Sequence, residues 1–139
     1  ATINENGESE VDEITANQEV QMVNNYLEKS NVNPVEELIL TKYLRNSFLA
    51  TKVAFFNEVF DLCETAGIDY NQVKALVGMD ERITHSHMHV PGPDGDRGFG
   101  GACFPKDTEA LVYSANVLGA TLPTLLTAIK SNKEKRKDK

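Results

Sequence analysis

The longest uninterrupted run of apolar and polar positions with helical spacing lies between Asn33 and Gly67. Asn33 suits the N-cap of a helix, Pro34 suits the first helical position, and Gly67 suits the position after the last turn. Neither Gly nor Pro occurs between Pro34 and Gly67. We therefore predict one helix over residues 34–66, about 50 Å long at about 1.5 Å per residue.

Two stripes of side chains follow this predicted helix. The first stripe comprises Lys42, Asn46, Leu49, Val53, Phe56, Phe60 and Cys63. The second stripe comprises Leu44, Phe48, Phe55, Val59 and Leu62. Two apolar stripes require burial on two sides. We predict that the domain covers one stripe and that a second copy of the chain covers the other; the alternative is that other helices of the same domain cover both.

Shorter amphipathic segments predict four further helices. Their ranges are 15–30, 70–77, 107–118 and about 121–136. The predicted N-caps of the last three are Asp69, then Asp107 or Thr108, then Thr121. No internal repeat and no convincing strand interrupts these patterns. The predicted fold class is therefore all-α, a helical bundle around one long central helix.

Apolar positions also predict which sides of the last two helices are buried. In 107–118 these positions are Leu111, Val112, Ala115 and Leu118, and in the last helix they are Leu122, Leu125, Leu126 and Ile129. After Lys130 the sequence is polar on every side, so we predict that the helix frays there or continues towards another domain. Residues 79–106 form a loop whose length is typical of functional or disordered segments.

The composition fits a folded domain with one core. The chain has 139 residues, of which 40% are hydrophobic and 25% charged. A net charge of −7 argues against general nucleic-acid binding. We recognise no signal peptide and no apolar run of the roughly 20 residues that cross a bilayer. Cys63 and Cys103 lie in different contexts, so we expect both to be reduced and the protein to be cytoplasmic.

The densest chemistry lies in residues 98–107, Gly-Phe-Gly-Gly-Ala-Cys-Phe-Pro-Lys-Asp. The three glycines allow the backbone to come close to a ligand. Cys103 precedes a predicted helix N-terminus and Lys106 follows it by three residues, a setting that favours the nucleophilic thiolate. The alternative is a glycine turn with a small buried cysteine.

Other polar residues support weaker hypotheses. Lys42 and Asn46 are four residues apart and so share one side of the central helix, although they could simply lie at its wetter end. Alternation would place His85, His87 and His89 on one side of an extended segment. No further ligand is suitably spaced, so we predict no metal site. The glycines lack the preceding strand of a dinucleotide-binding unit, so we expect no such domain in this chain.

Three motifs resemble one enzyme family. Residues 98–107 are similar to the catalytic-cysteine motif of the UDP-glucose 6-dehydrogenase and GDP-mannose dehydrogenase family, Gly-Phe-Gly-Gly-x-Cys-Phe-Pro-Lys-Asp. Residues 42–50 match its central-helix pattern, Lys-x-x-x-Asn-x-Phe-Leu-Ala, and residues 78–83 match Gly-x-Asp-x-Arg-Ile. The resemblance covers residues 34–130. It implies the central, all-helical dimerisation domain, of the type found at the C-terminus of 6-phosphogluconate dehydrogenase.

The resemblance also implies what surrounds this domain. Residues 1–33 would include the end of an NAD-binding domain, and residues 131–139 would begin the connector to a C-terminal nucleotide-binding domain. Enzymes of this family oxidise a sugar-nucleotide alcohol to a carboxylate with two NAD⁺ and a cysteine thioester. The segment 91–97 is longer than in some members, which leaves the particular sugar open. We expect the isolated chain to be inactive.

By resemblance, each site residue has a role. Cys103 would be the nucleophile, Lys42 and Asn46 would stabilise the oxyanion, and Asp107 would orient or deprotonate water. The binding residues would be Arg82, which reaches the sugar nucleotide of the neighbouring subunit, Phe99 and Gly100 at the sugar, and Lys106 near NAD. The alternatives are a non-catalytic dimerisation module, a GDP-mannose-type dehydrogenase, or a hydroxyacid dehydrogenase, which would need no nucleophilic cysteine.

Overall fold

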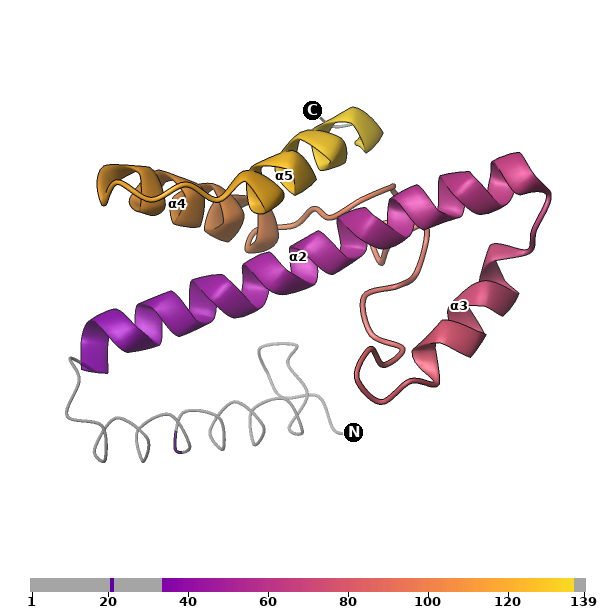
Figure 1. Ribbon diagram of the computed structural model, residues 1–139, viewed down its shortest axis with the longest axis horizontal. Coiled ribbons are helices and arrows are strands. Elements are labelled where there is room, and N and C mark those ends of the chain that lie inside the picture. Colours follow the sequence, from indigo (N-terminus) through magenta and orange to yellow (C-terminus); the bar gives the residue numbers. More distant parts are fainter. Residues whose placement is uncertain (1–20, 22–33, 137–139) are drawn as a thin grey trace, which may run out of the picture. The chain divides into compact units, whose positions relative to one another are not determined.

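The computed structural model describes Gln21 and residues 34–136 (Figure 1). Its helices are α2 (Pro34–Ala66), α3 (Tyr70–Gly78), α4 (Phe104–Val117) and α5 (Pro123–Lys135). Residues 34–136 contain no strand, and the predicted all-α class is confirmed. The helix predicted over 15–30 lies outside the described residues, apart from Gln21.

The chain divides into two compact units, and the boundary lies after Thr41. In the described part of the first unit, the Thr41 hydroxyl donates to the Glu37 carbonyl one turn earlier, over 2.7 Å. The second unit begins at Lys42 and contains the rest of the described chain. Every side chain of the predicted site belongs to this second unit, so the site can be described within it.

Helix α2 begins and ends where the sequence predicts. Gly67 ends it with φ at +70°, a conformation that glycine adopts without strain. The N–H of Ile68 donates to the Cys63 carbonyl over 2.9 Å and so satisfies one of the last carbonyls of the helix. Local capping chemistry therefore ends the central element at the predicted position.

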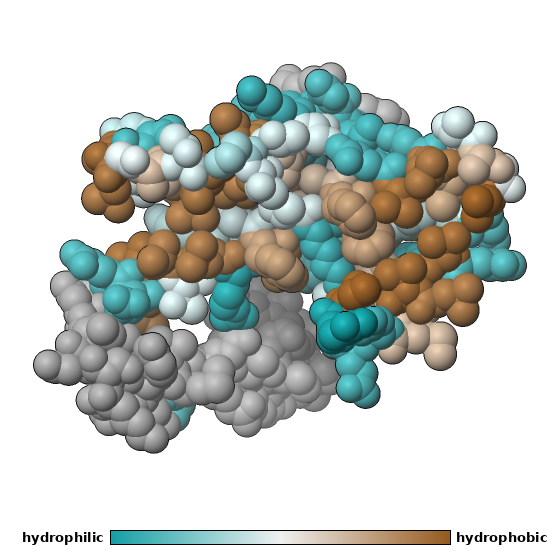
Figure 2. Space-filling view, viewed as in Figure 1, coloured by the Kyte–Doolittle hydropathy of each residue, from teal (hydrophilic) through white to brown (hydrophobic). Residues whose placement is uncertain are grey.

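The two stripes of α2 have different environments. In the first stripe, Phe56 and Cys63 are buried, and Val53 packs against a core cluster formed by Ala50, Ala54, Phe99 of the loop and Ala128 of α5. On the other side the exposed fractions are 50% for Leu44, 71% for Phe48, 59% for Phe55 and 66% for Leu62. Figure 2 shows hydrophobic surface along α2 and around α3. The alternative in which this domain covers both stripes is therefore wrong for the described part of the chain.

Helices α4 and α5 pack against each other (Figure 1). Leu111 of α4 forms a second core cluster with Leu125 and Ile129 of α5, and Tyr43 of α2 packs against it. The prediction that Leu118 points inward is wrong, because α4 ends at Val117 and Leu118 is 85% exposed. This cluster fixes the start of α4 beside α2, where the site lies.

Two predicted helix starts are wrong, and proline explains both. Helix α4 begins at Phe104 with Cys103 as its N-cap, three residues before the predicted start at Asp107. Helix α5 begins at Pro123 instead of Thr121. Proline has no N–H to leave unsatisfied and its φ is already helical, so it is favoured in a first turn. The predicted N-cap Asp69 of α3 is confirmed, since its carboxylate accepts from the Asn71 N–H.

Residues 79–103 connect α3 to α4 and are anchored to the helices at several points. The Tyr70 hydroxyl donates to the carbonyl of Met88, whose side chain is fully buried. The ammonium of Lys52 on α2 donates to the Ile83 carbonyl over 2.6 Å. Among the helices that the structure describes, none has the length and apolar sequence of a membrane-spanning segment.

Candidate active site

Asp107 links the start of α4 to α2. Its side chain is fully buried, and its Oδ2 accepts a hydrogen bond of 2.7 Å from Nδ2 of Asn46. The ammonium of Lys106 lies 3.4 Å from Oδ1 of the same carboxylate. The structure thus brings together three predicted site residues that come from two separate motifs.

The carboxylate of Asp107 is held in its charged form. Burial alone would raise its pKa, because the charged form loses water. The hydrogen bond from Asn46, the ammonium of Lys106 and the charge of Lys42 act in the opposite direction. As a net result, the pKa of Asp107 is lowered from its usual value. At neutral pH, Asp107 is therefore an anion that can accept hydrogen bonds.

Cys103 lies one helical turn before Asp107. The N–H of Asp107 donates to the Cys103 carbonyl over 2.8 Å. Both described cysteines are free; Cys103 is exposed, whereas Cys63 is buried. The alternative that Cys103 is a small buried side chain is therefore wrong.

Cys103 also lines a cavity of about 580 Å³. Its wall includes Val53, Ser86, His87, His89, Gly92, Pro93, Asp94 and Gly98 through Phe104. Phe99 and Gly100, which are predicted to contact a sugar, belong to this wall, whereas Lys42, Asn46 and Asp107 do not. The thiol therefore lines a hollow large enough for a small molecule and lies one helical turn before the buried carboxylate of Asp107.

The two remaining predicted site residues lie further from this centre. Lys42 is exposed on α2 and acts on Asp107 through its charge. Arg82 lies in the turn after α3 and makes two hydrogen bonds to Asp80, of 3.0 and 2.7 Å, which lower the pKa of Asp80. Its side chain is 88% exposed and does not line the cavity of Cys103. This chain alone therefore does not bring Arg82 to the thiol.

The three histidines do not share one side of an extended segment, so that prediction is wrong. The values of φ at Thr84 and His87 are +64° and +59°, so the chain turns between them. His85 approaches the Ala75 carbonyl, His87 stacks on Phe104, and His89 lies 3.1 Å from the Lys74 ammonium. Burial and the nearby charge of Lys52 lower the pKa of His87. No group of three or more potential metal ligands occurs in the described residues.

Three residues that hold the cysteine loop were missed by sequence reasoning. These are Asn57 of α2, Asn132 of α5 and Arg136, which follows α5. Asn132 and Arg136 continue the three- and four-residue spacing of Leu125 and Ile129, so the spacing itself was a usable signal. The sequence analysis did not assign Asn132 and Arg136 to the buried side of α5, because polar residues at the end of a helix usually face solvent.

The described residues form an all-helical domain in which the cysteine loop joins α3 to α4. The family described as "UDP-glucose/GDP-mannose dehydrogenase family, central domain" matches residues 36–134. The chain belongs to this family.

Individual relatives are similar over most of this chain. The UDP-glucose 6-dehydrogenase TuaD of Bacillus subtilis is 37% identical over 78% of the chain and 22% of its own length. The UDP-glucose 6-dehydrogenase of Rickettsia prowazekii is 46% identical over 68% of the chain and 20% of its own length. A solved UDP-glucose dehydrogenase from Pyrobaculum islandicum is 37% identical with a TM-score of 0.60, covering 68% of this chain and 21% of its own. The chain thus spans about a fifth of the length of these relatives.

Proposed function

We propose that this chain is the central domain of an NAD-dependent UDP-glucose 6-dehydrogenase in which Cys103 is the nucleophile. The observation that carries the proposal is the exposed thiol at the start of α4, one turn before the buried Asp107 that binds Asn46. The choice of UDP-glucose is supported by the relatives, which carry that name at 37% and 46% identity.

Among the described residues, Lys106 would contact NAD. Two NAD⁺ would each accept one hydride, one for each oxidation of the sugar carbon C6. The side chain of Lys106 is 62% exposed, so its ammonium can contact an anionic dinucleotide as well as Asp107. We assign the main dinucleotide site to a further domain, which residues 1–33 would join to residues 34–130, and a nucleotide-binding domain to the far side of residues 131–139.

The thiolate of Cys103 adds to the C6 aldehyde produced by the first oxidation. A carbon–sulfur bond forms and the carbonyl oxygen takes the negative charge. The Lys42 ammonium and an N–H of Asn46 stabilise this oxyanion, since an amide has two N–H groups and Asp107 uses one. Loss of hydride from C6 then leaves a thioester on Cys103.

Water hydrolyses this thioester, and Asp107 orients the water. A carboxylate with a lowered pKa is a weak base, so its role is to accept a hydrogen bond from the water rather than to hold its proton. The carbon–sulfur bond breaks, the thiolate of Cys103 leaves, and the sugar leaves as a carboxylate. Overall, one UDP-glucose, two NAD⁺ and one water give UDP-glucuronate, two NADH and three protons.

The same proposal includes a homodimer through α2. Leu44, Phe48, Phe55 and Leu62 expose an apolar stripe that a second copy of α2 would cover, and burial of such side chains stabilises association. The exposed Arg82 would then reach the sugar nucleotide of the neighbouring subunit. A guanidinium suits that role because its fork makes two hydrogen bonds to a phosphate.

The test is the ratio of NADH formed to UDP-glucose consumed by the full-length product of the gene. We expect two NADH per sugar, loss of turnover in Cys103→Ala, and unchanged turnover in the matched control Cys63→Ala. Turnover of GDP-mannose alone would assign the chain to the other branch of the family. A folded protein that oxidises neither sugar nucleotide would instead be a non-catalytic dimerisation module.

A further inference from the structure

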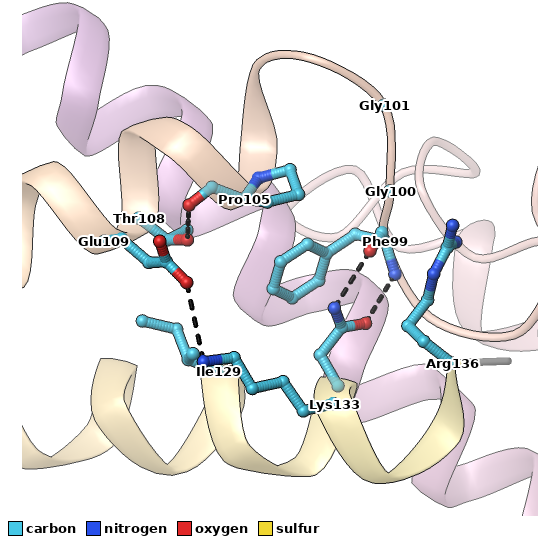
Figure 3. Close-up of a pocket in the computed structure, with 10 residues that line it drawn as sticks. Phe99, Gly100, Gly101, Pro105, Thr108, Glu109, Ile129, Lys133 and Arg136 are labelled. Carbon is cyan, nitrogen blue, oxygen red and sulfur yellow. Dashed lines mark hydrogen bonds and ion pairs between the residues drawn. The ribbon is translucent and has the colours of Figure 1, made fainter. Parts of the chain in front are cut away.

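One asparagine of α5 holds the glycine loop that precedes Cys103. The N–H of Phe99 donates to Oδ1 of Asn132 over 2.7 Å, and Nδ2 of Asn132 donates to the Phe99 carbonyl over 2.9 Å. The two dashed lines that reach Phe99 in Figure 3 are these bonds. Asn132 is only 6% exposed. An amide side chain presents a donor beside an acceptor, so it can pair with both polar groups of one residue.

Two glycines of the loop leave room for the side chains of Asn132 and Arg136. A Cβ on Gly98 would lie 2.1 Å from Oδ1 of Asn132, and a Cβ on Gly100 would lie 2.4 Å from Nη2 of Arg136. Both distances are far shorter than a carbon atom tolerates. These glycines therefore let α5 approach the loop backbone, whereas the sequence suggested that they make room for a ligand.

Arg136 extends the contact to the residues before Gly98. It is 8% exposed, and its Nη1 donates to Asp94 over 2.8 Å and to the Arg97 carbonyl over 3.4 Å. Its Nε lies 3.8 Å from the carboxylate of Asp96. A charge-assisted hydrogen bond to Asp94 and an ion pair with Asp96 keep the buried guanidinium in place. The longer segment 91–97 is thus tied to the end of α5.

Helix α2 holds the same loop from another direction. Oδ1 of Asn57 accepts from the N–H of Gly98 over 3.0 Å and from Nε of Arg97 over 2.9 Å. The ring of Phe99 packs into the core cluster between α2 and α5. The backbone is therefore fixed as far as Phe99, four residues before the thiol.

We infer that Asn132 is a positioning residue, whose two bonds to Phe99 set where the Cys103 thiol lies relative to the cavity and to Asp107. Between Phe99 and Cys103 the chain turns through Gly101, which has φ at +82° and no atom within 4 Å of the position of a Cβ. No neighbouring atom of the described chain holds the turn at Gly101 in place. The position of the turn is therefore set by Phe99, where the backbone is hydrogen-bonded to Asn132. The inference rests on the proposed function, because it concerns the place of the nucleophile.

The first test measures amide hydrogen exchange in this chain. In Asn132→Leu we expect the Phe99 amide to exchange at least about tenfold faster, while amides in α2 and α3 keep their rates, because only the bonds to the loop are lost. The matched control is Asn116→Leu, which changes an exposed asparagine of α4. An unchanged Phe99 rate, or an equal acceleration in every helix, would overturn the inference. If Asn132→Leu does not fold, the same comparison is made with Asn132→Gln, which displaces the amide by one methylene.

The second test measures catalysis in the full-length product of the gene. We expect Asn132→Gln to lower kcat per folded molecule about tenfold or more, at a temperature where the variant and the wild-type protein are both fully folded. A role in stability alone would leave that kcat unchanged, so a kcat within about twofold of wild type would overturn the inference. Failure of the proposed function is recognised separately. In that case either Cys103→Ala keeps the wild-type activity or the wild-type protein itself oxidises neither sugar nucleotide, while the exchange result at Phe99 still stands.

Discussion

At the scale of single residues, the site depends on a pair that are 61 positions apart in the sequence. Asn46 donates one N–H to the buried carboxylate of Asp107 and keeps a second N–H for another acceptor. Cys103, one turn earlier on the same helix as Asp107, remains exposed. One side chain is thus held and charged, while the thiol one turn earlier is left accessible.

The difference in exposure predicts selective alkylation. Iodoacetamide near neutral pH should modify Cys103 about tenfold or more faster than Cys63, because Cys63 is 4% exposed and reacts only when the fold opens. Mass spectrometry of peptides over time gives both rates. The control is the chain unfolded in urea, where both thiols should react alike. Equal rates in the folded chain would contradict the prediction.

The lowered pKa of Asp107 predicts a pH-dependent stability. A carboxyl whose pKa is lowered by folding stabilises the fold above its ordinary pKa of 3.8, and this contribution is lost as pH falls through the folded-state pKa. The free energy of unfolding, compared between wild type and Asp107→Asn by urea titration, should therefore differ most near neutral pH. The difference should shrink as the pH is lowered below that ordinary pKa.

Asn46→Leu checks the cause of this pH dependence. Without the Asn46 hydrogen bond, the pKa of Asp107 rises, so its stabilising contribution should be lost at a higher pH than in the wild-type chain. An identical pH dependence in Asn46→Leu and wild type would show that Asn46 does not hold the charge.

At the scale of elements, hydropathy alone does not identify the buried sides of α2 and α5. Helix α2 is apolar on two sides, and the described domain covers one of them. The buried side of α5 extends to two polar residues at its end. Asn132 and Arg136 bind the loop there instead of facing solvent. Burial of a polar side chain is tolerated here because each one is hydrogen-bonded.

The exposed stripe of α2 predicts that Phe48→Glu weakens self-association. Burying a Phe contributes about 1.5–3 kcal/mol, and a dimer loses two, so Kd should rise by about a hundredfold or more. Sedimentation velocity over a range of concentrations measures this change. The matched control is Leu118→Glu, which places the same charge at an 85% exposed site between α4 and α5. Equal effects of the two variants, or none, would argue against a dimer through α2.

At the scale of the whole molecule, the proposed function makes this chain one part of a larger dehydrogenase. It supplies a thiol, an oriented carboxylate and two candidate oxyanion donors, and it spans about a fifth of the length of its relatives. Its Arg82 is exposed and does not line the cavity of Cys103. Under the proposed function, Arg82 would contact the sugar nucleotide of a second copy.

Mixing two inactive variants of the full-length protein tests whether Arg82 acts between subunits. Arg82→Ala and Cys103→Ala should each be inactive as homodimers. After refolding together in equal amounts, half of the dimers are mixed, and each mixed dimer has one site with both Cys103 and a partner's Arg82. Activity should return to about a quarter of wild type. No recovery, with mixed dimers present, would place Arg82 in its own subunit's site.

The sequence by itself determined the features that depend on neighbouring residues. The end of α2 follows from Gly67, and the prolines at positions 105 and 123 favour the starts of α4 and α5. The three family motifs are equally local, so membership of the family was predictable and is confirmed. The second stripe of α2 also predicted that an apolar surface needs a partner.

Only the tertiary structure decided which groups meet. Polarity and spacing do not say that Asp107 is buried against Asn46, or that Asn132 pairs with Phe99. Such contacts join residues far apart in the chain, and they form because packing of α4 and α5 on α2 removes water from groups that must then bind each other. Local sequence therefore sets helices and motifs, whereas the charge state of Asp107 and the place of the Cys103 thiol arise from their packing.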